Sequence, residues 1–186
     1  GLHDDGRVDL ASVKAAVDAD AGLVAVMLAN NEIGTIQSLS DVVNVVSTAG
    51  IPVFSDATQA PAWLSLDVVD LGVDLLALSA HKLYGPKGIG ALYIRSRGRA
   101  SGLAPLIVGG GQERDRRGGT ENVPAIVGFG EACKIAVMER DAHSVRVATL
   151  RNQLLALLQL EIPDLVINGT MAARLPNNLN VCIPGV

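Results

Sequence analysis

Three residues with side chains capable of chemistry follow an apolar stretch near the middle of this sequence. Residues 73–78 are hydrophobic apart from one aspartate, and Ser79, His81 and Lys82 come directly after them. This pattern predicts a buried strand over 73–79 whose carboxyl end delivers polar side chains, the place where α/β sheets hold their sites. A lysine beside a low-dielectric pocket is a nucleophile that can form a Schiff base, whereas a lysine without such a pocket is ordinarily a solvated surface charge.

Polar side chains follow other apolar runs in the same way. Asn31 comes after the run 23–28, whose continuous apolar character predicts a fully buried parallel strand, and Asp56 and Gln59 come at the end of the run 51–56. If neighbouring strands deliver these groups to one edge, they match the needs of pyridoxal phosphate: a lysine, a carboxylate for the ring nitrogen, and small donors for the phosphate. Thr120 lies in a long Gly-rich loop, and a loop of that length is usually functional or disordered. The spacing alone does not establish the cofactor.

The hydrophobic periodicity predicts the elements that position these residues. We expect a mixed, mainly parallel sheet, because the run 89–94 follows the strand 73–79 too closely for a crossover helix and should pair with it antiparallel. Asp9 is expected to cap the first helix, and Gly50 to end the second. The predicted helices cover 10–19, 38–48, 65–71 and 124–160, and the predicted strands cover 23–28, 51–56, 73–79, 89–94, 165–167 and 179–183.

The composition restricts the partners. The chain of 186 residues has 49% hydrophobic residues and a net charge of −4, so no basic field is present that would attract nucleic acid or an anionic membrane. No apolar run is long enough and uncharged enough to suggest a spanning segment. Cys133 and Cys182 lack the spacing of metal ligands, which predicts no metal site and two reduced thiols of a cytoplasmic protein, both buried for packing.

Six motifs occur in order along the chain: Asn-Asn-Glu-Ile-Gly (30–34), Asp-Ala-Thr-Gln (56–59), Ser-Ala-His-Lys (79–82), Gly-Gly-Gly-Gln-Glu-Arg (109–114), Gly-Thr-Glu-Asn (119–122) and Asn-Asn-Leu-Asn-Val (177–181). Together they closely resemble the NifS/IscS-type cysteine desulfurases. The resemblance implies a class V, fold-type I pyridoxal-phosphate enzyme: an α/β fold with helices on both faces of a mixed, mainly parallel sheet. It also implies that residues 1–145 are part of the cofactor-binding large domain and that 146–186 begin a C-terminal small domain.

The same resemblance assigns a role to each candidate residue. Lys82 would form the Schiff base and move protons at the substrate α-carbon, and Asp56 would pair with the pyridinium nitrogen. Gln59 and Asn31 would surround the phenolic oxygen and the substrate, while Ser79 and His81 would bind the phosphate. Thr120 would reach the phosphate bound to the neighbouring subunit, which implies a homodimer.

The implied function is the removal of sulfur from L-cysteine, giving alanine and an enzyme persulfide. The sulfur would pass to an acceptor or scaffold protein for iron–sulfur cluster assembly or tRNA thiolation. The family's loop with its nucleophilic cysteine has no counterpart in this sequence. Asp115 and Gly118 depart from the usual glycine and serine of the Gly-rich motif. Three alternatives stay open: a selenocysteine lyase, a desulfurase for DNA phosphorothioation, and a catalytically inactive fragment that keeps only the dimer scaffold.

Overall fold

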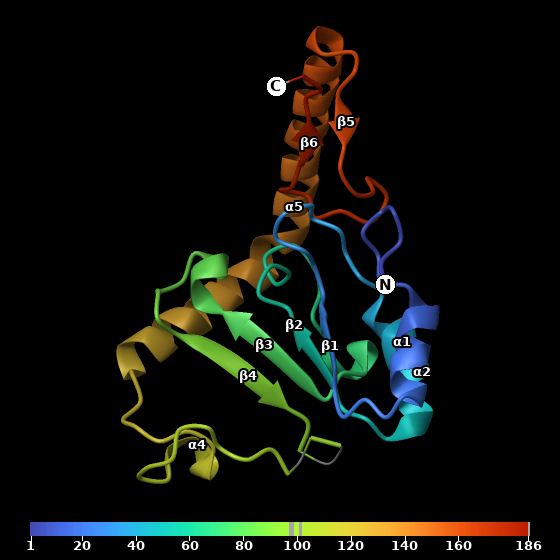
Figure 1. Cartoon of the computed structure of the whole chain (residues 1–186). Helices are drawn as coiled ribbons and strands as arrows, with labels where there is room; N and C mark the ends of the chain where they lie inside the picture. The colour runs from blue at the N-terminus through green and yellow to red at the C-terminus, as the bar shows by residue number, and fades with distance from the viewer. Residues whose placement is uncertain (97–98, 101, 186) are drawn as a thin grey trace.

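A four-stranded sheet forms the centre of the computed structural model, which describes residues 1–96, 99–100 and 102–185. The strands lie in the order β1-β2-β3-β4; the first three are parallel and β4 is antiparallel to β3 (Figure 1). The prediction of a mixed, mainly parallel sheet is therefore confirmed. The strands are β1 (Val24–Met27), β2 (Val53–Asp56), β3 (Leu75–Ser79) and β4 (Gly90–Ile94).

The main hydrophobic core lies between this sheet and the helices of the first part of the chain. It joins buried side chains of α2, β2 and β3, among them Val46, Val53 and Leu76. Asp9 caps α1 as predicted, since its Oδ1 accepts a hydrogen bond of 2.9 Å from the N–H of Ala11. The helices on this side are α1 (Leu10–Asp18), α2 (Leu39–Val46), the short η1 (Ser47–Ala49) and α3 (Val68–Leu71).

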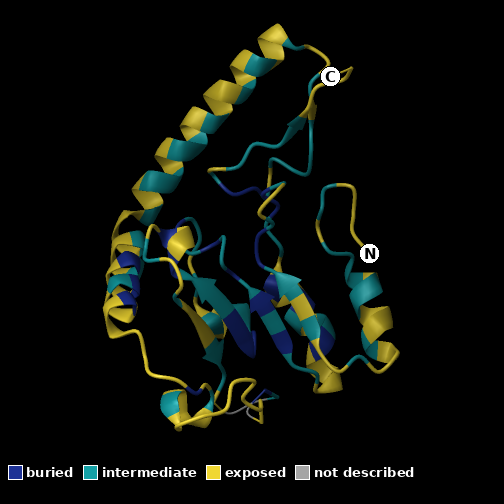
Figure 2. Cartoon of the chain, turned by 60° about the vertical axis from the view of Figure 1, so that its left-hand side comes forward, coloured by how far each residue is buried: buried dark blue, intermediate teal, exposed yellow. Residues whose placement is uncertain are grey.

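A single long helix, α5 (Val123–Glu161), lies on the opposite side of the sheet from α1 (Figure 2). Its first turns pack Phe129 and Ala132 against η2 (Ala80–Leu83), which follows β3. The predicted domain boundary after residue 145 falls within this continuous helix, so the division into two domains stays a prediction. The remaining elements are α4 (Gln112–Asp115) and the antiparallel pair β5 (Val166–Ile167) and β6 (Val181–Cys182).

Three expectations about the elements were wrong in detail. The first strand is not fully buried, because β1 forms an edge of the four-stranded sheet and Ala25 is exposed. The turn predicted from residue 65 begins at Val68, where Asp67 caps it. Cys182 is exposed rather than buried, since it lies in a two-residue strand whose pairing, within the described part of the chain, is with β5 alone; Cys133 is half-buried in α5.

Candidate active site

The carboxyl ends of β1, β2 and β3 lie at one edge of the sheet. Met27 is opposite Asp56 in the register of β1 and β2, and Asp56 is opposite Ala77 in the register of β2 and β3. Because all these strands run in the same direction, the segments that follow them start side by side (Figure 1). The structure thus brings the Asn31 segment, Asp56 and Ser79 to the same edge, as expected from the sequence.

Ser79 and His81 form a pair at the end of β3. The Oγ of Ser79 lies 2.8 Å from Nδ1 of His81, and the ring tautomer decides which of them donates. Lys82 is the next residue of η2 and its side chain is exposed. No carboxylate of the described residues is within ion-pair distance of its amine. Within the described residues, the amine is therefore solvent-exposed and not neutralised by an ion pair.

Asp56 is the last residue of β2, and Gln59 lies in the tight turn that follows. Asp56 is half-buried, and its Oδ1 accepts a hydrogen bond of 2.9 Å from the N–H of Thr58. The fully buried Ala57 and Ala60 fix the turn against the core. The carboxylate is thereby held in one orientation by its own backbone, an arrangement typical of aspartate in turns. Such a fixed carboxylate suits a cationic ring nitrogen.

Asn31 lies in the turn after β1. The neighbouring Asn30 shapes this turn, since its Oδ1 accepts from the N–H groups of Glu32 at 2.8 Å and Ile33 at 2.9 Å. Asn31 itself is exposed, and its Nδ2 donates to Oε1 of Glu32 over 2.7 Å. An amide nitrogen carries two hydrogens, so one N–H of Asn31 is oriented by Glu32 and the other can be donated to a ligand.

Thr120 does not join the other candidate residues. It is exposed and follows Gly119, whose N–H donates to Oε1 of Gln112 over 3.0 Å. The loop with α4 lies beside β4, away from the carboxyl ends of β1 to β3 (Figures 1 and 2). Within one chain, Thr120 therefore cannot complete the same site.

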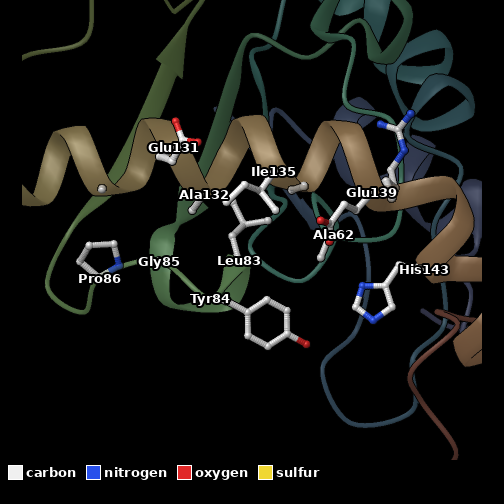
Figure 3. Close-up of a pocket in the computed structure, with 13 residues that line it drawn as sticks. Ala62, Leu83, Tyr84, Gly85, Pro86, Glu131, Ala132, Ile135, Glu139 and His143 are labelled. Carbon is white, nitrogen blue, oxygen red and sulfur yellow. The ribbon is translucent and has the colours of Figure 1, made fainter.

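A hollow of about 540 Å³ lies between α5 and the turn after η2 (Figure 3). Apolar side chains line most of it, with Glu139 and His143 at one end. None of the candidate residues borders this hollow, although Leu83 follows Lys82 directly. This hollow is therefore separate from the predicted site.

Sequence reasoning missed the role of two asparagines. The side chains of Asn178 and Asn180 both donate hydrogen bonds to the carbonyl oxygen of Glu32, at 2.8 and 3.1 Å. The motif at 177–181 was noticed, but no local pattern connects it with a turn almost 150 residues earlier.

The described part of the chain holds neither a cluster of metal ligands nor a membrane-spanning helix. There, no three His, Cys, Asp or Glu side chains gather in a way that could hold a metal ion. No helix in those same residues is long and apolar enough to cross a membrane.

The whole sequence was compared with models of known protein families. The sequence model of the family described as "Aminotransferase class-V" matches residues 1–186. The chain belongs to the class V aminotransferase family. Members of this class V family are pyridoxal-phosphate enzymes, and the residues present fit that cofactor: a free lysine amine, a fixed carboxylate, and a hydroxyl–imidazole pair lie at one sheet edge.

Relatives within the class V family include cysteine desulfurases. The chain is 47% identical over 177 residues to "Cysteine desulfurase IscS" of Anaeromyxobacter dehalogenans, an alignment that covers 95% of this chain and 44% of the relative. A solved "NIFS-LIKE PROTEIN" superposes with a TM-score of 0.90 at 39% identity, over all of this chain and 50% of that one. DndA from Streptomyces lividans gives a TM-score of 0.85 at 34% identity, over 96% of this chain and 50% of that one. The chain thus spans about half the length of these relatives, and its fold is that of the NifS-like, fold-type I enzymes.

Proposed function

We propose that the protein containing this chain is a pyridoxal-phosphate-dependent cysteine desulfurase. The observation that carries the proposal is the gathering of Asp56, the Ser79–His81 pair and Lys82 at the carboxyl ends of adjacent strands. The IscS and NifS-like names of its relatives support cysteine as the substrate. The products would be alanine and a persulfide.

The side chains of this site would divide the work. Bound pyridoxal phosphate supplies an aldehyde and an electron-withdrawing ring. Lys82 would hold the cofactor covalently through its amine and then move protons at the substrate α-carbon. Asp56 would keep a proton on the ring nitrogen, and Ser79 with His81 would bind the phosphate. Each group already lies at the sheet edge where the cofactor would bind.

Asn31 and Gln59 would orient the cofactor and the substrate. The second N–H of the Asn31 amide would donate to the phenolic oxygen, since Glu32 accepts from the first. Gln59 lies half-buried in the turn that fixes Asp56. Both amides are neutral, so they can orient an anionic group without adding charge.

Thr120 supports a homodimeric enzyme. Because it is exposed and its loop, which includes α4, lies away from the strand ends, we infer that Thr120 contributes to the phosphate site of a second copy. An assembly in which each copy completes the other's site would account for the separation of Thr120 from Lys82. Equilibrium ultracentrifugation of the complete gene product would test the dimer.

The sulfur acceptor is not assigned to either cysteine of this chain. Burial raises the pKa of the Cys133 thiol, which makes it a weaker nucleophile at neutral pH. Cys182 is exposed but lies in β6 rather than in a loop. Onward transfer to a scaffold for iron–sulfur clusters or to tRNA thiolation, and a cytoplasmic location, stay proposals. Because the chain is similar in structure to DndA, transfer of the sulfur to DNA phosphorothioation remains the second proposal.

Borohydride reduction tests the proposed function. The complete gene product is mixed with pyridoxal phosphate, reduced, digested and mapped, and a Lys82→Arg variant is treated in parallel. We expect the pyridoxyl group on Lys82 alone, and release of alanine from L-cysteine that the Arg variant has lost. Labelling spread over Lys14, Lys87 and Lys134, or unchanged alanine release by Lys82→Arg, would contradict the proposal.

A further inference from the structure

Side chains from a distant segment of the chain form hydrogen bonds to the turn that carries Asn31. The carbonyl oxygen of Glu32 accepts two side-chain hydrogen bonds, one of 2.8 Å from Nδ2 of Asn178 and one of 3.1 Å from Nδ2 of Asn180. A carbonyl oxygen has two lone pairs, so these donors satisfy it completely. The position of Glu32, and with it the turn, therefore depends on both asparagines.

The two asparagine amides are themselves fixed in orientation. The Oδ1 of Asn178 accepts a hydrogen bond of 2.8 Å from Nη1 of Arg174, and the Oδ1 of Asn180 accepts one of 2.7 Å from Nδ2 of Asn168. Arg174 is 94% buried, and its guanidinium also donates to the carbonyl oxygens of Asn168 and Thr170. Turning either amide over would place NH₂ against another donor, so both NH₂ groups face Glu32.

The backbones of the two segments are joined as well. The N–H of Leu175 donates to the carbonyl of Gly34 over 2.9 Å, and the N–H of Ile36 donates to the carbonyl of Ala173 over 2.8 Å. A side chain at Gly34 would meet the Asn178 side chain at 2.5 Å. The fit is close enough that a shift of Asn178 must be transmitted to the turn.

Glu32 connects these contacts to Asn31. Its carbonyl is held by Asn178 and Asn180, and its carboxylate accepts from Nδ2 of Asn31 over 2.7 Å. We propose that Asn178 and Asn180 are positioning residues, which hold Glu32 so that the amide of Asn31 presents its free N–H to the cofactor. This role rests on the proposed function of Asn31.

A double-mutant cycle between Asn31 and Asn178 tests the role. Asn178→Asp keeps the shape of the side chain and its bond to Arg174, but places an oxygen against the Glu32 carbonyl. In the complete gene product loaded with pyridoxal phosphate, we expect kcat for L-cysteine to fall about 10- to 100-fold, the cost of small displacements near a reacting group. We expect the absorption maximum of the lysine-bound cofactor, and the pH midpoint of that absorption, to shift in the same direction as in Asn31→Ala.

The decisive comparison is Asn178→Asp in the Asn31→Ala background, where we expect less than a twofold further loss of kcat. A further loss equal to that in the unaltered protein would mean that Asn178 acts on overall structure, and would overturn the role. Asn177→Asp, an exposed neighbour, is the matched control and should retain full kcat. Asn180→Ser, which removes the longer bond, replaces Asn178→Asp if that variant does not fold.

Hydrogen exchange provides a readout that does not depend on turnover. In the cofactor-free protein, Asn178→Asp should speed exchange of the amides of residues 32–36 at least tenfold and leave those of β2 unchanged. Equal exchange in both proteins would overturn the role while leaving the desulfurase proposal intact. Failure of the unaltered protein to bind the cofactor at Lys82, or full kcat in Asn31→Ala, would instead contradict the proposed function and this role with it.

Discussion

The Oγ of Ser79 lies 2.8 Å from Nδ1 of His81, so the last residue of β3 orients an imidazole that comes one residue before Lys82. This bond occupies one ring nitrogen and leaves Nε2 for a ligand. Under the proposed function, the hydroxyl of Ser79 and the imidazole of His81 would donate to the phosphate, and the amine of Lys82, the next residue along, would react with the aldehyde.

Replacing Ser79 by alanine should lower the affinity for pyridoxal phosphate about 10- to 100-fold. The variant loses a hydrogen bond to the charged phosphate and releases the ring of His81, and hydrogen bonds to charged groups are worth about 1.5–3 kcal/mol. Equilibrium dialysis of the cofactor-free complete protein measures the affinity. Ser65→Ala changes an exposed serine outside the site and should bind like the unaltered protein. An affinity of Ser79→Ala within twofold of the unaltered protein would exclude Ser79 as a phosphate ligand.

Replacing Asp56 by asparagine should separate its charge from its role in the turn. The Asn side chain can still accept from the N–H of Thr58, so the fold should be retained. Without the carboxylate, the pKa of the ring nitrogen falls by about 1–3 units, and we expect kcat to fall about 10- to 1,000-fold. Steady-state kinetics together with thermal melting measure both effects. Equal kcat in the two proteins would show that Asp56 does not pair with the ring.

The position of Asp56, Ser79 and Lys82 at or just after strand ends could be predicted from the sequence because they follow apolar runs. Strand ends are where α/β sheets place their sites, and the roles of these residues stay predictions. The contact of Asn178 with Glu32 could not be predicted, since it joins residues 146 positions apart. The exposure of Cys182 was missed because an apolar strand pattern does not say whether a further layer covers the strand. Propensity and periodicity report local structure; the strand order and such long-range contacts depend on packing.

The cap of α1 should make the start of the chain sensitive to acid. The hydroxyl of Ser12 and the N–H of Ala11 donate to the carboxylate of Asp9 and hold its pKa below the ordinary value of 3.8. Since the folded-state pKa is the lower one, the stabilisation is complete above pH 3.8 and is lost as the pH falls through the folded-state value.

Hydrogen exchange of the α1 amides between pH 3 and pH 6 checks this cap. Protection in the unaltered protein should decrease toward pH 3, after correction for intrinsic rates. Asn is an equally good capping residue that does not titrate, so Asp9→Asn should keep its protection over the whole range. Asp9→Ala should be less protected at every pH. The same acid dependence in Asp9→Asn and in the unaltered protein would assign it to other carboxylates.

Two glycines with nearly the same positive φ allow the contact between the Asn31 turn and Asn178 to be tested by itself. Gly34 has φ +70° and Gly50 has φ +69°, but a side chain at Gly34 would meet Asn178 at 2.5 Å, whereas one at Gly50 would meet nothing within 4 Å. Gly50→Ala should cost about 1–2 kcal/mol of unfolding free energy, the penalty of a left-handed alanine. Gly34→Ala should cost about 1–3 kcal/mol more, because it adds an overpacked contact.

Urea unfolding of the complete gene product measures the two glycine variants. Both variants carry the same backbone penalty, so it cancels when their unfolding free energies are subtracted. The remaining difference is the free-energy cost of displacing Asn178 from Glu32. Gly34→Ala should also weaken retention of pyridoxal phosphate during dialysis, whereas Gly50→Ala should not. Equal unfolding free energies for the two variants would mean that the segment around Asn178 moves aside without a free-energy cost. Such a segment could not hold the turn of Asn31 in place.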